Sequence, residues 1–248
     1  MESSNKNIIS SFKVQEELNP DIWYSDGKTY KMKPEVRVSL LDIVKNYRDF
    51  VDAELDIDDV TLTGSLANFN WSEFSDVDLH ILMDFDTNSD PLLKKYLDSR
   101  RMIWNSLRAI TVKGYDVEIY VQDTNEPHFA SGVYSVLYNE WIVEPNKEEV
   151  NIDSKKILSK AKNWMGQIDR FEVDAKREDP KVILDNIDKF KKKMKKYRGS
   201  GLEDKGEYSY ENLTFKFLRR NEYLKKLNDV RNYLIDKNLT LEENVSNV

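Results

Sequence analysis

Cysteine is absent from this chain of 248 residues, and histidine occurs only twice. Without cysteine the chain has no disulfides and no thiolate nucleophile. Two histidines without cysteine argue against a zinc site, and no Ser-His-Asp spacing indicates a hydrolase. A chain that lacks cysteine is compatible with a reducing cytosol, and we expect a cytoplasmic location.

Long apolar runs are missing as well. The N-terminal stretch MESSNKNIISSFKVQEELNP lacks the apolar core of a signal peptide. Nowhere does the chain contain the run of about 18 apolar residues that a transmembrane helix needs, so we expect no membrane partner. The hydrophobic fraction of 40% is nevertheless enough for the core of a soluble globular protein with one domain or two small ones.

The net charge of −7 is unevenly distributed along the chain. Residues 1–150 hold 15 Lys and Arg against 28 Asp and Glu, a net charge of −13. Residues 151–248 hold 23 against 17, a net charge of +6. This asymmetry suggests a division of labour in which the acidic half holds metal and the basic half holds phosphate.

The order of the patterns predicts an α/β half with a small mixed sheet, followed by a helical half. Residues 1–33 are polar and carry the turn signals Asn19-Pro20 and Asp26-Gly27, so we expect an irregular N-terminal segment. Residues 34–148 alternate between helical and strand patterns and are expected to form the α/β domain. Its predicted elements are helices that start at Pro34 and at Asp90-Pro91, strands over 59–63, 77–85 and 115–122, and a hairpin over 133–143.

Residues 149–248 have helical periodicity and are expected to form an all-helical C-terminal domain. We predict helices over residues 153–176, 180–197 and 210–237. The stretch RGSGLEDKGEYS, residues 198–209, is rich in glycine and poor in apolar residues, which predicts a loop between the last two helices.

Three acids stand out in the α/β half. Asp76 and Asp78 lie one residue apart on a predicted strand, so their side chains point to the same side, ~7 Å apart along the backbone. Glu118 lies on the strand 115–122, on the face opposite Val117 and Ile119. Carboxylates so placed repel one another unless a cation lies between them. Oxygen ligands of this kind suit Mg²⁺, and a pair of divalent ions ~3.5–4 Å apart is what phosphoryl and nucleotidyl transfer requires.

A Gly64-Ser65 pair precedes these acids, at the point where the strand 59–63 is expected to turn into one or two helical turns over 65–70. Such a turn lets the backbone approach a triphosphate closely, and offers amides at a helix N-terminus and a hydroxyl donor. We therefore expect Gly64 and Ser65 to bind the phosphates of a nucleotide.

The ordered set Gly64-Ser65, Asp76-Val77-Asp78 and Glu118 within VEIYV resembles the DNA polymerase beta-like nucleotidyltransferase superfamily. The resemblance covers residues 60–121, and the chain as a whole is similar to uncharacterised nucleotidyltransferase-like proteins of tailed phages. It implies transfer of a nucleoside monophosphate from a nucleoside triphosphate (NTP) such as ATP to a hydroxyl, with release of pyrophosphate. It also implies two Mg²⁺ ions, or Mn²⁺, held by Asp76, Asp78 and Glu118, with Glu118 as the base. Glu118 stands where many relatives carry Asp, so its carboxylate is one methylene farther from the backbone.

Members of the superfamily often grip the triphosphate with basic residues of a helical region. Lys216, Arg219 and Arg220 are spaced i, i+3, i+4 on one helix face and are the candidates for this role, with surface charge as the alternative. The NTP is then expected between the two halves. Arg100 and Arg101 are further basic candidates.

The run KFKKKMKKYR, Lys189–Arg198, is either a solvated helix face or a binding surface for RNA or another polyanion. Several aromatic and histidine side chains could contact nucleotide or simply pack: Trp71, His80, His128, Tyr134, Tyr138, Phe190 and Tyr197. The basic half favours an RNA 3′ end as acceptor. A protein hydroxyl, as in antitoxin-type adenylyltransferases, a small molecule and cyclic-nucleotide synthesis remain open. A catalytically inactive nucleotide-binding or nucleic-acid-binding module is the alternative of another class.

Overall fold

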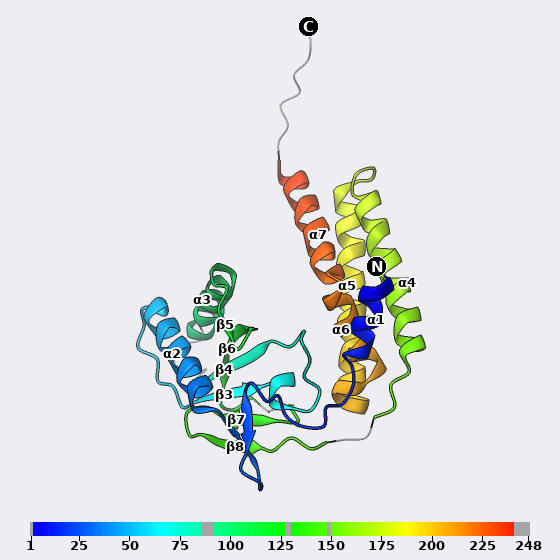
Figure 1. Cartoon of the computed structure of the whole chain (residues 1–248). Coiled ribbons are helices and arrows are strands. Elements are labelled where there is room, and N and C mark those ends of the chain that lie inside the picture. Colours follow the sequence, from blue (N-terminus) through cyan, green and yellow to red (C-terminus); the bar gives the residue numbers. More distant parts are fainter. Residues whose placement is uncertain (1, 86–91, 127–129, 148–149, 241–248) are drawn as a thin grey trace. The chain divides into compact units, whose positions relative to one another are not determined.

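A computed structural model describes residues 2–85, 92–126, 130–147 and 150–240. The chain divides into two compact units (Figure 1). Residues Lys13–Glu149 form an α/β unit, and Met1–Phe12 together with Val150–Val248 form a helical unit. Within the described ranges, none of the helices combines the length and the apolar character needed to cross a membrane.

The N-terminal segment is more regular than its polar composition predicts. It contains a helix, α1 (Glu2–Ser10), and a two-stranded hairpin of β1 (Trp23–Ser25) and β2 (Tyr30–Met32). The expectation of an irregular segment over residues 1–33 was therefore wrong. The strands are too short to show alternation, and their stability comes from tertiary packing, since the buried Trp23 ring stacks on Trp141 at 4.7 Å.

A six-stranded mixed sheet forms the centre of the α/β unit, in the order β5-β6-β4-β3-β7-β8. The pair β4–β6 is parallel and the other neighbours are antiparallel. Its strands are β3 (Asp59–Thr63), β4 (Val77–Met83), β5 (Thr111–Val112), β6 (Tyr115–Asp123), β7 (Val133–Ser135) and β8 (Glu140–Val143). The predicted α/β class, strands and hairpin agree with this sheet, and the predicted helix start at Asp90-Pro91 lies outside the described residues.

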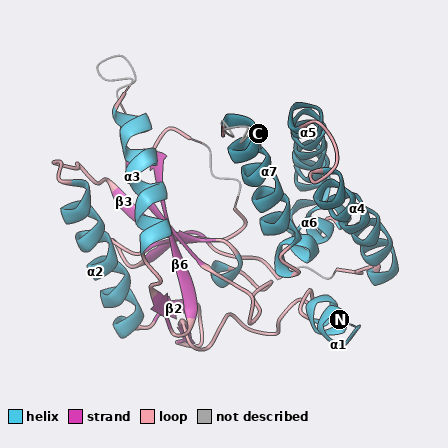
Figure 2. Cartoon of the chain, turned by 90° about the horizontal axis from the view of Figure 1, so that it is seen from above, coloured by secondary structure: helices cyan, strands magenta, loops and turns pink. Residues whose placement is uncertain are grey.

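Two helices cover one face of this sheet. The helices α2 (Pro34–Val51) and α3 (Leu93–Leu107) contact each other and lie together on the same side (Figure 2). Alternate strand residues, among them Leu62, Leu79 and Ile119, are buried in the core that these helices complete. Because side chains alternate along a strand, the residues between them project from the opposite face.

The helical unit contains α4 (Ser154–Asp174), α5 (Pro180–Lys205), α6 (Tyr210–Arg220) and α7 (Tyr223–Leu239) in addition to α1. Helix α5 continues through the predicted loop 198–209 as far as Lys205. A Cβ on Gly201 would lie 2.4 Å from the Cβ of Glu211. This glycine therefore permits close packing of α5 on α6 and does not break the helix.

The predicted helix over 210–237 is two helices. Asn221 ends α6, where its side-chain amide donates to the carbonyl of Phe217 at 3.0 Å. The next residue, Glu222, has a φ of 61°, in the left-handed region that a continuous helix excludes. Apolar residues keep their helical spacing across this break, so periodicity alone could not reveal it.

Candidate functional site

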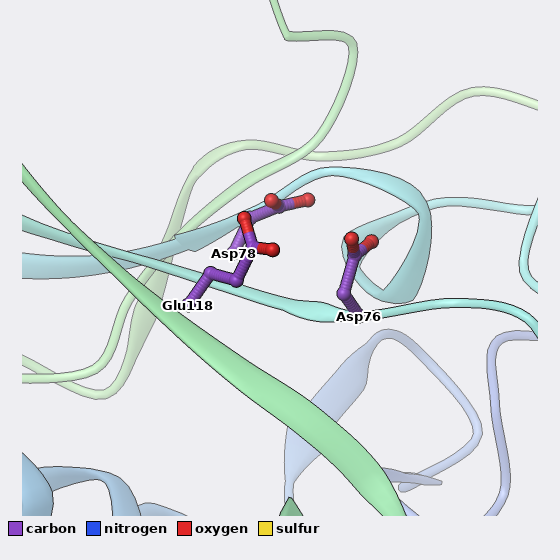
Figure 3. Close-up of side chains that lie close together, drawn as sticks. All are labelled: Asp76, Asp78 and Glu118. Carbon is purple, nitrogen blue, oxygen red and sulfur yellow. The ribbon is translucent and has the colours of Figure 1, made fainter. Parts of the chain in front are cut away.

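The structure brings the three predicted acids together on the face of the sheet opposite α2 and α3. Asp76 immediately precedes β4, Asp78 lies on β4, and Glu118 is its direct partner on the parallel strand β6. All three carboxylates project from the same side of the two strands (Figure 3). Each offers an oxygen, and these oxygens lie within 4.8 Å of one another.

The neighbouring apolar residues explain why the acids point this way. Val77 and Leu79 on β4 and Ile119 on β6 are turned into the core under α2 and α3. Burial of these side chains fixes the register, because a slip by one residue would carry the carboxylates into the core. The site is thus a direct product of strand alternation.

The acids fit a divalent cation. Two oxygens bound to the same Mg²⁺ ion lie roughly 3 to 4 Å apart, so small side-chain rotations within the cluster reach this geometry. Asp76 and Asp78 are half-buried, whereas Glu118 is exposed. Carboxylate oxygens without cysteine or histidine ligands are the donor set expected for Mg²⁺ or Mn²⁺.

Gly64 lies directly against Asp78. Its backbone has φ 75° and ψ −159°, a conformation that is essentially restricted to glycine. A Cβ at this position would lie 1.9 Å from Oδ2 of Asp78. The glycine that was predicted to approach a phosphate is therefore also required for the position of a carboxylate.

Ser65 begins a single 3-10 turn, Ser65–Ala67, which is shorter than the predicted one or two helical turns. The amides of Ala67 and Asn68 donate to the carbonyls of Gly64 and Ser65. The Ser65 hydroxyl lies 2.8 Å from the hydroxyl of Ser75, the residue before Asp76. Ser65 thus ties the turn to the acidic strand, a contact that sequence spacing did not indicate.

Tyr120 is a further residue of this face, and the sequence analysis assigned it no function. Its hydroxyl donates to Oε2 of Glu118, two residues earlier on β6. Burial, followed by the hydrogen bond to Glu118, raises the pKa of Tyr120, so the phenol keeps its proton and acts as a donor. Alternation along VEIYV already placed Tyr120 on the same side as Glu118, and this signal could have found it.

His80 stacks on Tyr120 with ring centroids 4.9 Å apart. Its Nδ1 lies 2.8 Å from Oε1 of Gln122. The guanidinium of Arg101 lies 5.5 Å from the centre of the Tyr120 ring, and it pairs with Asp98 at 3.5 Å. His80 and Arg101, both candidates for nucleotide contact, thus surround the tyrosine next to the acids.

The predicted triphosphate-binding residues belong to the helical unit. Lys216 is largely buried and pairs with Glu207 at 3.4 Å, and burial lowers the pKa of Lys216. Arg220 donates to the hydroxyl of Ser11 at 2.5 Å and lies over the ring of Phe12, so it helps to hold α1. Arg219 is exposed on the same helix.

Most of the aromatic candidates serve packing. Phe190 is buried, with its ring 6.0 Å from that of Trp164, so it cannot stack on bases. The half-buried ring of Tyr197 lies 4.9 Å from the same tryptophan. Tyr134 is buried. Trp71 and Tyr138 donate to the backbone carbonyls of Glu17 and Asp58, and Arg100 donates to that of Phe50. His128 lies outside the described residues.

The lysine run lies on the solvent side of α5. Lys189, Lys192, Lys193 and Lys196 follow the spacing i, i+3, i+4, i+7 and are all exposed. Lys189 pairs with Asp185 at 2.5 Å. Within the part of the chain that the structure describes, the other three make no ion pair.

Comparisons with known proteins give little for this chain. No protein-family model and no curated protein matches it. A solved structure that it resembles is that of a STING-associated CdnE c-di-GMP synthase from Capnocytophaga granulosa, at 14% sequence identity over 84% of each chain. The TM-score is 0.25, which does not establish a shared fold.

Proposed function

We propose that this protein is a metal-dependent nucleotidyltransferase, which transfers a nucleoside monophosphate from an NTP to an acceptor hydroxyl and releases pyrophosphate. The observation that carries the proposal is the cluster of Asp76, Asp78 and Glu118 on two parallel strands, with the Gly64-Ser65 turn against Asp78. These residues also carry the resemblance to the DNA polymerase beta-like superfamily. Acidic clusters are common on protein surfaces, but this one combines three features: the order of Gly64-Ser65, Asp76, Asp78 and Glu118 along the chain, the register that pairs Asp78 with Glu118, and the close contact of Gly64 with Asp78.

Each residue has a separate task in this reaction. Asp76, Asp78 and Glu118 would hold two divalent ions, which when bound neutralise phosphate oxygens and lower the pKa of the acceptor hydroxyl. We assign Glu118 as the acceptor of the proton of that hydroxyl, because it is exposed to an incoming acceptor whereas Asp76 and Asp78 are half-buried. The turn at Gly64 and Ser65 would bind the phosphates of the NTP.

We further propose an RNA 3′ end as the acceptor. The exposed lysines of α5 support a polyanion, because four charges on one helix face match a run of phosphates better than a single small molecule. A protein hydroxyl or a small molecule would not need this surface. A protein with the cluster but no transfer would be a nucleotide-binding or nucleic-acid-binding module.

The test compares wild type with Asp76→Asn plus Asp78→Asn. Each labelled NTP is incubated with Mg²⁺ or Mn²⁺ and fractionated cell lysate, and both pyrophosphate and the labelled macromolecule are measured. The double variant should lose cation-dependent NTP binding and pyrophosphate release. The matched control is Asp56→Asn plus Asp58→Asn, which removes two exposed acids of the same spacing outside the cluster.

A second comparison separates enzyme from binding module. Glu118→Gln should retain much of the NTP affinity and lose transfer by about 100-fold or more. Asp116→Asn, an exposed acid on the same strand, should retain both. Wild type that binds NTP yet releases no pyrophosphate with any nucleotide or lysate fraction would establish the binding module instead.

A further inference from the structure

Glu118 differs from its two partners in its environment. It is exposed, whereas Asp76 and Asp78 are half-buried, and its side chain has one more rotatable bond. An exposed flexible carboxylate loses more side-chain entropy when it is fixed on a ligand. A site that uses Glu at this position therefore benefits from a second group that holds the carboxylate.

Tyr120 is placed to do this. It stands on the same strand and face as Glu118, and its hydroxyl donates to Oε2. A phenol is a suitable partner because it fixes one oxygen without adding a positive charge. A lysine or arginine there would neutralise the carboxylate and compete with a cation for it.

The ring of Tyr120 is itself held. His80 stacks on it at 4.9 Å and is positioned by Gln122, and the Arg101 guanidinium lies 5.5 Å from the ring centre. These contacts come from β4, β6 and α3. The hydroxyl is thus presented to Glu118 by a supported ring and not by a mobile one.

We propose that Tyr120 is a positioning residue that orients Glu118 for cation binding and proton acceptance, an inference that rests on the proposed function. The hydroxyl holds Oε2, which leaves Oε1 and the second lone pair of Oε2 for the cation. Tyr120 acts only through Glu118 and has no role of its own in the transfer.

The experiment measures Mn²⁺ affinity by electron paramagnetic resonance and NTP turnover for wild type and Tyr120→Phe. We expect a loss of about 10-fold or more in cation affinity or in kcat, as is typical when a group that orients a metal ligand is removed. The matched control is Tyr115→Phe on the same strand, which removes the hydroxyl that accepts a 2.7 Å hydrogen bond from the Asn19 side chain. It should leave Mn²⁺ affinity unchanged.

A double-mutant cycle with Glu118→Gln tests whether Tyr120 acts through Glu118. If Tyr120 acts through Glu118, Tyr120→Phe changes neither cation affinity nor turnover in the Glu118→Gln background. Equal losses in both backgrounds would overturn the proposal, as would wild-type affinity and turnover in Tyr120→Phe.

Crystal structures of wild type and Tyr120→Phe separate this inference from the proposed function. The Glu118 carboxylate should leave its position in the variant, whether or not a cation is bound. A Glu118 carboxylate in the same position in both structures refutes the positioning role. Wild-type protein that binds no Mn²⁺ and shows no turnover refutes the proposed function, and the position of Glu118 in the two structures still decides whether Tyr120 orients it.

Discussion

Replacement of Gly64 by alanine should damage the acidic site more than the fold. The backbone at φ 75° and ψ −159° is strained for any residue with a Cβ, at about 1–3 kcal/mol. The new Cβ would also lie 1.9 Å from Oδ2 and 2.9 Å from Cγ of Asp78. The carboxylate must then move by roughly 1.5 Å to reach an ordinary van der Waals separation.

The two effects can be measured separately. We expect the free energy of unfolding, from urea titration, to fall by about 1–3 kcal/mol, and Mn²⁺ affinity to fall by about 10- to 100-fold. Gly114→Ala is the matched control, because Gly114 has φ 86° and a methyl group there would meet nothing within 4 Å. Gly114→Ala should lower the free energy of unfolding by a similar amount and leave Mn²⁺ affinity unchanged.

The result that would refute this reasoning is a Gly64→Ala protein with wild-type Mn²⁺ affinity and the same loss of stability as Gly114→Ala. Asp78 would then not need its observed position to bind a cation. Addition of Asp78→Asn gives a further check, since Gly64→Ala should have little extra effect on cation binding once this carboxylate is absent.

Three further predictions concern other parts of the chain. Reversal of Lys192, Lys193 and Lys196 to Glu should weaken RNA binding and flatten its salt dependence in filter-binding assays, whereas unchanged acceptor modification across salt concentrations would make the run a solvated face. Gly201→Ala should destabilise the helical unit by about 1–3 kcal/mol in urea titration, because the new Cβ would lie 2.4 Å from the Cβ of Glu211. Gly199→Ala, where a Cβ would meet nothing within 4 Å, should instead stabilise the helix by up to about 1 kcal/mol. Equal effects of the two substitutions would contradict the packing role of Gly201. Burial raises the pKa of Asp59 above its ordinary value of 3.8, so the folded protein binds this proton more tightly than the unfolded chain does. The contribution of Asp59 to the free energy of unfolding therefore falls as the pH rises from about 4. Asp59→Asn should remove this pH dependence from urea titrations, and an unchanged pH dependence in the variant would contradict the prediction.

Strand alternation made the acidic cluster predictable. Asp76, Asp78 and Glu118 each stand between residues that are buried or packed against the core, and this pattern is visible in the sequence. The parallel pairing that sets Asp78 opposite Glu118 was not predicted, because periodicity does not specify which strands are neighbours or in which direction they run.

The parts that could not be predicted depend on tertiary contacts. Gly201 was interpreted as a loop residue, although its role is the close approach of α6. Helix α1 has a polar sequence, and it lies against α6, a segment about 200 residues away in the chain. Gly64 was predicted to approach a phosphate, and only the folded structure reveals its contact with Asp78.

The division of the chain has a consequence for its synthesis on the ribosome. Because Met1–Phe12 belongs to the helical unit, residues 13–149 are inserted between the first helix of that unit and the rest. Helix α1 is synthesised before residues 13–149, whereas α6 begins only at Tyr210, which at about 5–20 residues per second leaves a delay of roughly 10 to 40 s. During this interval Ile8 and Phe12 have no completed core to enter, although both are buried in the finished protein. We therefore expect the nascent chain to fold its acid-bearing unit first, while the Ile8 and Phe12 side chains stay accessible to chaperones until translation has passed α6.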